Sequence, residues 1–387
     1  MEQGSRYVGL DVHQETIAVA VADSGEAAPR FVGTIPNHPA AWFKLVQRLG
    51  PAARLRVCYE AGPSGYGLYR QLARWGVACV VVAPSLIPTR PGERVKTDRR
   101  DALKLARLLR SGDLTAVWVP DAAHEALRDL ARARESPKRD LQRARQRLLK
   151  LLVRLEQAPA GGVRRWTRRY RAWLSGLEVA QPLQQLVLEA AREAVEQAEQ
   201  RLGRLTAQLQ GVAQASPWAP LLGALQCLRG VGVITAVTLV AELGDLTRFP
   251  RARQLMGYSG LTPREHSSGG RQRRGAISKA GNAHVRFVSV EAAWHYRHGP
   301  RPSASLAQRR RDQPAAVVAL AEQAETRLSR RYRHLVGRGK LPQQAVVAVG
   351  RELLGFVWAI AQQVAAEQTR SGGQADSAAG PRTAFGA

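Results

Sequence analysis

The chain has 387 residues, enough for two or three domains, and 45% of them are hydrophobic, so it can form ordinary buried cores. Lysine and arginine number 58 against 31 aspartate and glutamate, and the resulting net charge of +27 predicts a polyanionic partner. The cysteines Cys58, Cys79 and Cys227 are too few and too scattered for a disulfide framework or a zinc site. Because the sequence shows neither a signal-peptide pattern nor an apolar run of membrane length, we expect a cytoplasmic, nucleoid-associated protein.

The N-terminal third predicts a mixed α/β sheet. Short apolar runs separated by turn residues such as Asp23-Ser24-Gly25 are typical of strands. Strands first, followed by alternation with helices, indicate a mixed sheet, which we assign to a domain of residues 1–118. In chain order we expect strands over 7–12, 16–22 and 30–35, a helix over 37–49, a strand over 54–60, a helix over 64–75 and a strand over 77–82.

Four acids stand at informative places in this domain. Asp11 ends the first apolar run and Glu60 ends a later one, where a carboxylate is costly unless it is solvated, paired or bound to a metal. Asp98 and Asp101 are three residues apart at the start of a helical segment, so both lie on one face of that helix. Each acid alone is more simply explained as solvated or as serving the helix dipole. Together they predict a divalent-metal site that serves phosphoryl chemistry.

Residues 119–214 predict a helical coiled-coil arm. Its first half carries leucines at intervals of seven, four and three, the pattern of a coiled-coil seam, at Leu141, Leu148, Leu152 and Leu155. A second seam runs from Val187 to Leu209, and Ser136-Pro137 marks either the start of a new helix or a kink. The two helices form either an antiparallel hairpin within one chain or an arm that joins protomers, and the sequence leaves both open.

The connector between the two seams interleaves basic and aromatic residues from Arg164 to Trp173. Such a mixture suits contact with a nucleic-acid backbone combined with base stacking. The aromatic spacing of four and three, at Trp166, Tyr170 and Trp173, equally fits the packing face of an amphipathic helix. We therefore interpret the aromatic residues as packing residues and the arginines as phosphate contacts.

Residues 215–367 predict a mostly helical domain. The segment 225–236 resembles a helix-hairpin-helix, in which the turn Gly230-Val231-Gly232 would offer backbone N–H groups to a phosphate beside Arg229. Closing helices are expected over 314–334 and 341–367, followed by a disordered tail over 368–387.

A glycine- and arginine-rich loop over 260–275 carries two adjacent serines, Ser267 and Ser268, and leads to a helix that runs through Trp294. From the residues alone, the simplest interpretation is a flexible basic segment that contacts the DNA backbone. The expected nucleic-acid contacts in and after this loop are Arg271, Arg273, Arg274 and Lys279.

These motifs together resemble one family, the DEDD insertion-sequence transposases, which are related to the Piv and MooV DNA invertases and described as bridge-RNA-guided recombinases. The segments G-L-D-V, Y-E-A-G-P-S-G-Y and K-T-D-R-R-D-A-L-K-L-A resemble its RNase H/RuvC-like domain. The segments G-V-G-V-I-T-A, G-L-T-P-R-E-H-S-S-G-G and I-S-K-A-G-N resemble its C-terminal transposase domain. The resemblance covers residues 6–300, with the motifs in the right order.

The resemblance implies a transposase that cuts and rejoins DNA through a phosphoserine intermediate, is guided by a bridge RNA and works as a homo-oligomer. It implies that Mg²⁺ or Mn²⁺ is bound by Asp11, Glu60, Asp98 and Asp101. The nucleophilic serine precedes a glycine, which points to Ser268 before Gly269, with the adjacent Ser267 left open. Two alternatives remain: a RuvC-like nuclease that hydrolyses branched DNA without Ser268, and a basic architectural binder that needs neither acids nor serine.

Overall fold

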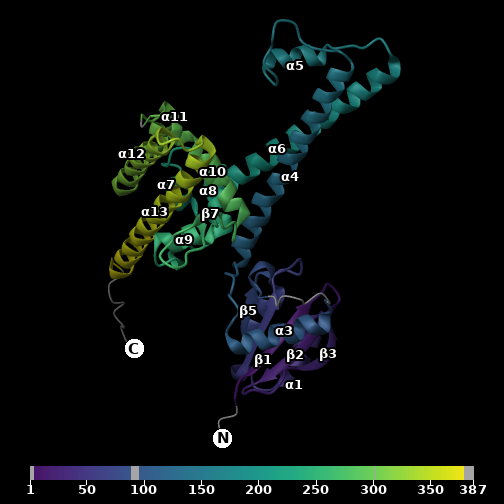
Figure 1. Ribbon diagram of the computed structural model, residues 1–387, viewed down its shortest axis with the longest axis vertical. Coiled ribbons are helices and arrows are strands. Elements are labelled where there is room, and N and C mark those ends of the chain that lie inside the picture. The colour runs from purple at the N-terminus through teal and green to yellow at the C-terminus, as the bar shows by residue number, and fades with distance from the viewer. Residues whose placement is uncertain (1–3, 89–95, 300, 379–387) are drawn as a thin grey trace, which may run out of the picture. The chain divides into compact units, whose positions relative to one another are not determined.

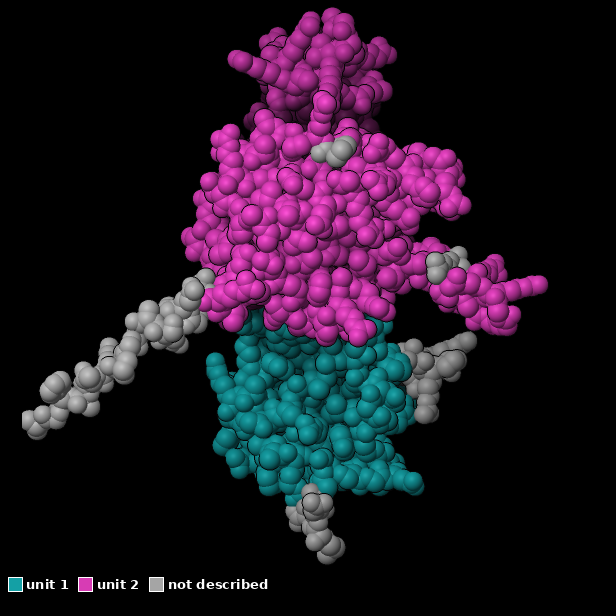
Figure 2. All heavy atoms as spheres, turned by 90° about the vertical axis from the view of Figure 1, so that its left-hand side faces the viewer, with its two compact units in different colours: residues 1–121 teal, residues 122–387 magenta. Residues whose placement is uncertain are grey.

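The computed structural model describes residues 4–88, 96–299 and 301–378, without the side chains of Arg274 and of residues 371–378. The chain forms two compact units, residues 1–121 and residues 122–387 (Figure 2). Each unit has its own hydrophobic clusters, and each is described separately below.

The first unit contains the mixed sheet that the apolar runs predicted (Figure 1). The strand order is β3-β2-β1-β4-β5, with β1 antiparallel to β2 and parallel to β4. Its elements are β1 (Arg6–Val12), β2 (Thr16–Asp23), β3 (Arg30–Pro36), α1 (Pro39–Leu49), β4 (Leu55–Glu60), α2 (Gly67–Arg74), β5 (Ala78–Val82) and α3 (Asp98–Ser111).

Helices cover both faces of this sheet. The alternation of side chains along β2 shows which helices cover which face. Ile17 and Val19 pack in a cluster that includes Leu45 of α1. Ala18, on the opposite face, packs in a cluster of small residues that includes Ala102 of α3. Because successive strand residues point to opposite faces, the large side chains meet α1 and α2 while the alanines meet α3.

Gly9 allows α3 to lie unusually close to β1. A β-carbon at this position would be 2.3 Å from the carbonyl oxygen of Ala102 and 2.4 Å from the backbone nitrogen of Ala106. Carbon atoms in ordinary contact are about 3.5–4.0 Å apart, so only glycine fits here. The close approach brings the first turn of α3, with Asp98 and Asp101, toward the end of β1.

The second unit is mostly helical (Figure 1). Its helices are α4 (Ala122–Arg154), α5 (Arg168–Ser175), α6 (Pro182–Ala215), α7 (Ala219–Leu225), α8 (Val233–Leu243), α9 (Ala252–Tyr258), α10 (Ala283–Ala293), α11 (Ala304–Arg310), α12 (Ala315–Gly337) and α13 (Pro342–Ala378). A short antiparallel pair, β6 (Pro263–Glu265) and β7 (Arg274–Ile277), lies between α9 and α10 in the chain.

Helices α4 and α6 pack antiparallel within one chain. Arg134 Nε donates to Thr206 Oγ1 at 2.8 Å, and further along α4 Arg145 Nη2 donates to Glu199 Oε1 at 2.5 Å. The residue later in α4 therefore contacts the residue earlier in α6, and only an antiparallel pair of helices produces this order. The intramolecular hairpin is therefore present, and the joining of protomers by this arm stays a prediction.

Pro137 lies inside α4, which continues unbroken from Ala122 to Arg154. The proline therefore starts no new helix, because tertiary packing along the pair outweighs one missing backbone hydrogen bond. In the connector, the ring centroids of Trp166 and Tyr170 are 5.5 Å apart and those of Tyr170 and Trp173 are 5.3 Å apart. Tyr170 is buried in the cluster of the helix pair, which confirms the packing interpretation of the aromatic residues.

Helix α13 is a core helix of the second unit. Within the described residues, Pro342–Arg370 is long and apolar enough to cross a membrane by length and composition, but half of its most apolar window is buried inside the unit. Val346, Leu353 and Ile360 belong to the main hydrophobic cluster, as expected of a core helix. The sequence placed the end of this helix at 367, whereas α13 extends to Ala378; residues 379–387 of the expected tail lie outside the described residues.

Candidate metal centre and serine hairpin

The parallel pairing of β1 and β4 places Asp11 and Glu60 at the same end of the sheet. The register pairs Gly9 with Cys58 and Leu10 with Tyr59, so the next residues along the two strands are the two acids. The Cys58 thiol contacts the carbonyl oxygen of Leu105 on α3 at 3.5 Å. Because side chains alternate, Glu60 lies on this α3 side of the sheet, as Asp11 does on β1.

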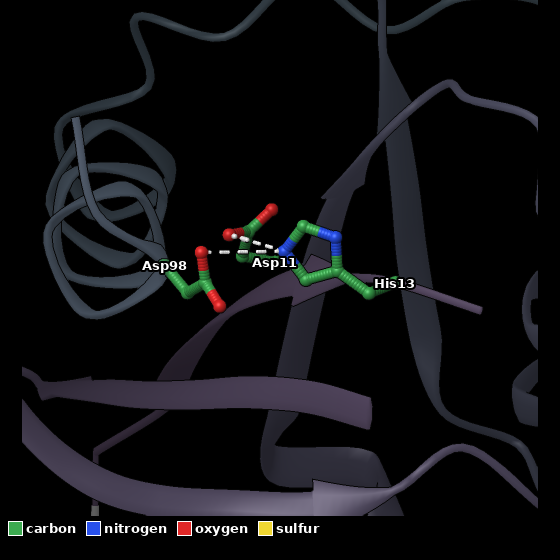
Figure 3. Close-up of side chains that lie close together, drawn as sticks. All are labelled: Asp11, His13 and Asp98. Carbon is green, nitrogen blue, oxygen red and sulfur yellow. Dashed lines mark ion pairs between the residues drawn. The ribbon is translucent and has the colours of Figure 1, made fainter. Parts of the chain in front are cut away.

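Asp11, His13 and Asp98 form the centre of the site (Figure 3). His13 Nε2 lies 3.3 Å from Asp11 Oδ2 and 3.4 Å from Asp98 Oδ1. One ligand atom from each of the three residues lies within 4.8 Å of the other two. The structure thus brings together a strand end, the turn after it and the first turn of α3.

The electrostatics of Asp11 reflect this crowding. Burial raises the pKa of the Asp11 carboxyl above its ordinary value, and the carboxylates of Asp101 and Asp98 raise it further. His13 acts in the opposite direction through its charge and its hydrogen bond, but the pKa stays raised. A cation among these carboxylates would relieve the repulsion, as metals do at clustered acids.

Glu60 and Asp101 lie around this centre. Asp11, His13 and Glu60 line one surface pocket together with Lys96. Lys96 Nζ lies 3.8 Å from Asp101 Oδ2, and the Lys96 side chain is 82% exposed, so this pair is weak and easily rearranged. Among the described residues, the three-residue group of Asp11, His13 and Asp98 includes neither Glu60 nor Asp101.

His13 and Lys96 belong to the site but were not among the site residues predicted from the sequence. His13 stands two residues after Asp11, and residues two apart on an extended chain point to the same face, so the D-V-H pattern was the available signal. Lys96 precedes the helix cap Thr97 and carried no comparable signal.

The donor chemistry fits a hard divalent cation. The four predicted acids supply carboxylate oxygens, the ligands that Mg²⁺ and Mn²⁺ prefer. Asp11, His13 and Asp98 hold their donor atoms close to a common point, although they come from different elements. The carboxylates of Asp11 and Asp98 would hold the ion, with Glu60 and Asp101 at the edge of the same site.

The predicted basic loop is a β-hairpin rather than a flexible segment. Strands β6 and β7 pair with Pro263 opposite Ile277, and toward the tip Ser268 and Arg271 exchange backbone hydrogen bonds of 3.3 and 3.1 Å. Between them, Gly269 has φ 57° and Gly270 has φ 77°. Positive φ at both central residues is the feature of a type I′ turn, which glycine adopts without strain.

The two serines of the hairpin differ in their surroundings. Ser267 Oγ donates to Glu265 Oε1 at 2.8 Å, and Gln272 Nε2 donates to the same oxygen at 3.0 Å. Ser268 Oγ has no hydrogen-bond partner among the side chains that the structure describes, and Ser268 is exposed beside the glycine turn. Glu265 is a further residue of the hairpin that was not predicted from the sequence.

Basic residues flank the tip. Arg271 and Arg273 are exposed on the hairpin, whereas the side chain of Arg274 lies outside what the structure describes. Lys279 is exposed after β7 and has a left-handed φ of 56°, and its backbone N–H donates to Gly260 O at 3.1 Å. Arg271, Arg273 and Lys279 therefore lie on an accessible surface.

The predicted helix-hairpin-helix residues have mixed surroundings. Arg229 forms an ion pair with the buried Glu325, which favours a structural role for this arginine. A β-carbon at Gly230 would be 2.3 Å from the carbonyl oxygen of Ala292, so this part of the turn packs against α10. Gly232, by contrast, caps α8 in open space and keeps its accessibility to a phosphate.

Comparison with known proteins finds two family models, one over the region that holds the carboxylate site and one over the region that holds the serine hairpin. A family model described as "Transposase" matches residues 8–156, and one described as "Transposase IS116/IS110/IS902 family" matches residues 223–306. A putative transposase of Sinorhizobium fredii is 44% identical over 370 residues, covering 94% of this chain and 90% of that protein.

Two other relatives extend the comparison. The transposase for insertion sequence element IS1533 of Leptospira borgpetersenii is 34% identical over 337 residues, covering 86% of this chain and 97% of its own. The pilin gene-inverting protein of Moraxella bovis is 23% identical over 304 residues, covering 76% of this chain and 77% of its own.

Proposed function

The chain belongs to the IS116/IS110/IS902 family of insertion-sequence transposases and is a DNA transposase, and from this premise we propose that it cuts and rejoins DNA through a covalent bond to Ser268. The observation that carries the proposal is the hairpin tip. An exposed serine stands beside two glycines and exposed arginines, so a DNA phosphate has steric access to the hydroxyl and cationic partners nearby.

The chemistry is a balanced transesterification. Ser268 Oγ attacks a phosphodiester phosphorus, a P–O bond to serine forms, and the P–O bond to one deoxyribose oxygen breaks. The serine proton leaves, and the released deoxyribose oxygen gains a proton. Because the phosphodiester energy is kept in the serine ester, a DNA hydroxyl can reverse the step and rejoin strands without an external energy source.

The carboxylate site supports the same proposal. A divalent metal, when bound, would act as a Lewis acid at the phosphate. Asp11, Glu60, Asp98 and Asp101 would hold it, and exposed arginines such as Arg271 and Arg273 would neutralise phosphate charge. The competing interpretation, metal-dependent hydrolysis of branched DNA, uses the acids alone.

DNA is the substrate of a transposase, and the net charge of +27 supports extensive backbone contact. The family resemblance further implies a bridge RNA as guide, and we include it in the proposal. We place the activity in the cytoplasm at the nucleoid, where the DNA lies.

We also infer that protomers associate through the arm of α4 and α6. Near the start of α6, Leu183, Leu186 and Val187 are 69%, 62% and 49% exposed. Their spacing of three and one places them on one side of the helix, while Leu188 is buried against α4. An exposed apolar stripe beside a packed seam supports the pairing of two arms.

The proposal is tested by trapping the covalent intermediate. Full-length protein is incubated with a nicked suicide substrate carrying an element end, and the protein–DNA adduct is mapped by mass spectrometry. We expect an adduct on Ser268, none in the Ser268→Ala protein, and a retained adduct in the matched Ser267→Ala control.

Three outcomes contradict the proposal in different ways. An adduct on Ser267 would move the reaction to the serine that Glu265 contacts. An adduct on a tyrosine such as Tyr258 would overturn the serine mechanism. Efficient cleavage with free ends and no adduct would favour the hydrolytic nuclease.

Association is tested by mixing two inactive proteins. We propose that the acids of one protomer serve the serine of another, so Asp11→Asn and Ser268→Ala proteins should restore part of the activity when mixed. The absence of any rescue, with subunit exchange demonstrated separately, would contradict this arrangement.

A further inference from the structure

We propose that His13 is a direct ligand of the divalent metal and that its ring nitrogen makes the site select Mn²⁺ over Mg²⁺. The inference rests on the proposed metal site and adds a ligand that the four-acid pattern does not contain. It also assigns the site a preference between two metals that the sequence left equivalent.

The spacing of the donor atoms matches a shared ion. His13 Nε2 lies 3.3 Å from one Asp11 oxygen and 3.4 Å from one Asp98 oxygen. A metal with ligand bonds of about 2.1 Å separates neighbouring ligand atoms by about 3 Å, so small shifts complete the coordination. Figure 3 shows the imidazole nitrogen directed at the two carboxylates, which come from β1 and α3.

The backbone of His13 is fixed by neighbours of its own. The His13 N–H donates to Thr16 O at 2.9 Å, which closes the turn between β1 and β2. Asn37 Nδ2 donates to His13 O at 2.6 Å, and Trp42 Nε1 donates to Asn37 Oδ1 at 3.0 Å. These hydrogen bonds fix the backbone of His13, and a fixed backbone helps to orient a metal ligand before the ion binds.

The identity of the ligand atoms decides the preference. Mg²⁺ demands near-ideal octahedral geometry and is bound mainly by oxygen, including several waters. Mn²⁺ also suits carboxylate oxygens, but it belongs to the first-row transition metals, whose ions bind nitrogen as well as oxygen ligands, so an imidazole beside the carboxylates disfavours it less than it disfavours Mg²⁺. A site with Asp11, Asp98 and His13 therefore favours Mn²⁺.

The alternative role of His13 is an ion-pair partner of the two carboxylates. The His13 side chain is 51% exposed, so such a pair would contribute little to stability. The two roles differ in one measurable respect, because only a ligand transfers electron-spin density from Mn²⁺ to the imidazole nitrogen.

The experiment is pulsed EPR of Mn²⁺ bound to the full-length protein, together with titrations of Mn²⁺ and Mg²⁺ binding. We expect a ¹⁴N coupling in the unaltered protein and its loss in His13→Gln, with the Mn²⁺ dissociation constant raised roughly 10- to 100-fold and that of Mg²⁺ changed less. His334→Gln, an exposed histidine on α12, is the matched control and should keep both the coupling and the affinity.

A second variant separates ligation from charge pairing. His13→Glu offers an oxygen ligand of similar reach, so it should bind both metals without a nitrogen coupling and lose the preference for Mn²⁺. A mere ion-pair role predicts instead that His13→Glu, by adding a fifth carboxylate without coordination, leaves the ratio of Mn²⁺ affinity to Mg²⁺ affinity unchanged.

The results distinguish this inference from the proposed function. Mn²⁺ binding that depends on Asp11 but shows no ¹⁴N coupling would overturn the role of His13 and leave the metal site intact. A coupling that persists in His13→Gln would likewise overturn it. Mn²⁺ binding that is unaffected by Asp11→Asn would contradict the metal site itself.

Discussion

Replacing Gly9 with alanine should separate the strand-end acid from the helical acids. The added β-carbon would be 2.3 Å from Ala102 O, and ordinary contact needs about 3.4 Å, so α3 must move away from β1 by about 1 Å. Such overpacking typically costs about 1–3 kcal/mol of folding stability. A ligand set tolerates displacements of only about 0.5 Å, so the shift should weaken metal binding more than it weakens the fold.

The assay compares metal affinity, DNA cleavage and thermal unfolding in Gly9→Ala and in a matched control, Gly67→Ala. Gly67 begins α2 in the same unit, and a β-carbon there would meet nothing within 4 Å. We expect Gly9→Ala to bind metal at least about tenfold more weakly and the control to be unchanged. Full metal affinity and cleavage in Gly9→Ala would refute the idea that the close packing of α3 sets the site.

Three further predictions concern charge. Asp11→Asn, Glu60→Gln and Asp101→Asn should each abolish DNA cleavage and leave DNA binding by gel shift largely intact; full cleavage in Mg²⁺ would count against the metal site. DNA affinity should fall about a thousandfold between roughly 50 and 200 mM salt, and a flat salt dependence would contradict extensive phosphate contact. Burial would raise the pKa of Glu242, but hydrogen bonds from Arg132 and Asn282 outweigh it and hold the pKa below 4.5, so its contribution to stability exists above pH 4.5 and is lost as pH falls through the lowered value. Glu242→Gln should cost about 3 kcal/mol at neutral pH and flatten this acid-side loss in denaturant titrations, whereas the exposed Glu196→Gln should do neither.

Much of the first unit could be predicted because its signals are local. Apolar runs of strand length, broken by turn residues, gave the strand that ends near Asp11 and the one that ends at Glu60. The helix that starts at Asp98 follows a threonine cap whose hydroxyl accepts from Arg100 N, a pattern visible in the sequence.

The basic loop shows where local signals were incomplete. Glycine and arginine content pointed to flexibility, yet Gly269 and Gly270 form a tight turn that holds two strands together. The same glycines predict a hairpin once strand partners are available, but β6 and β7 are too short to be recognised by alternation.

The sequence by itself determined which residues are available for the proposed chemistry. They are the many basic residues, four acids at the ends of elements, and a serine before two glycines. Only the tertiary structure decided which of these residues meet. His13 meets Asp98, which is 85 positions later in the chain, and Arg229 forms an ion pair with Glu325. The packing of α3 on Gly9 and of α12 in the helical core brings these distant segments together. Local periodicity records the face on which a side chain lies, whereas its partner depends on how separate elements pack.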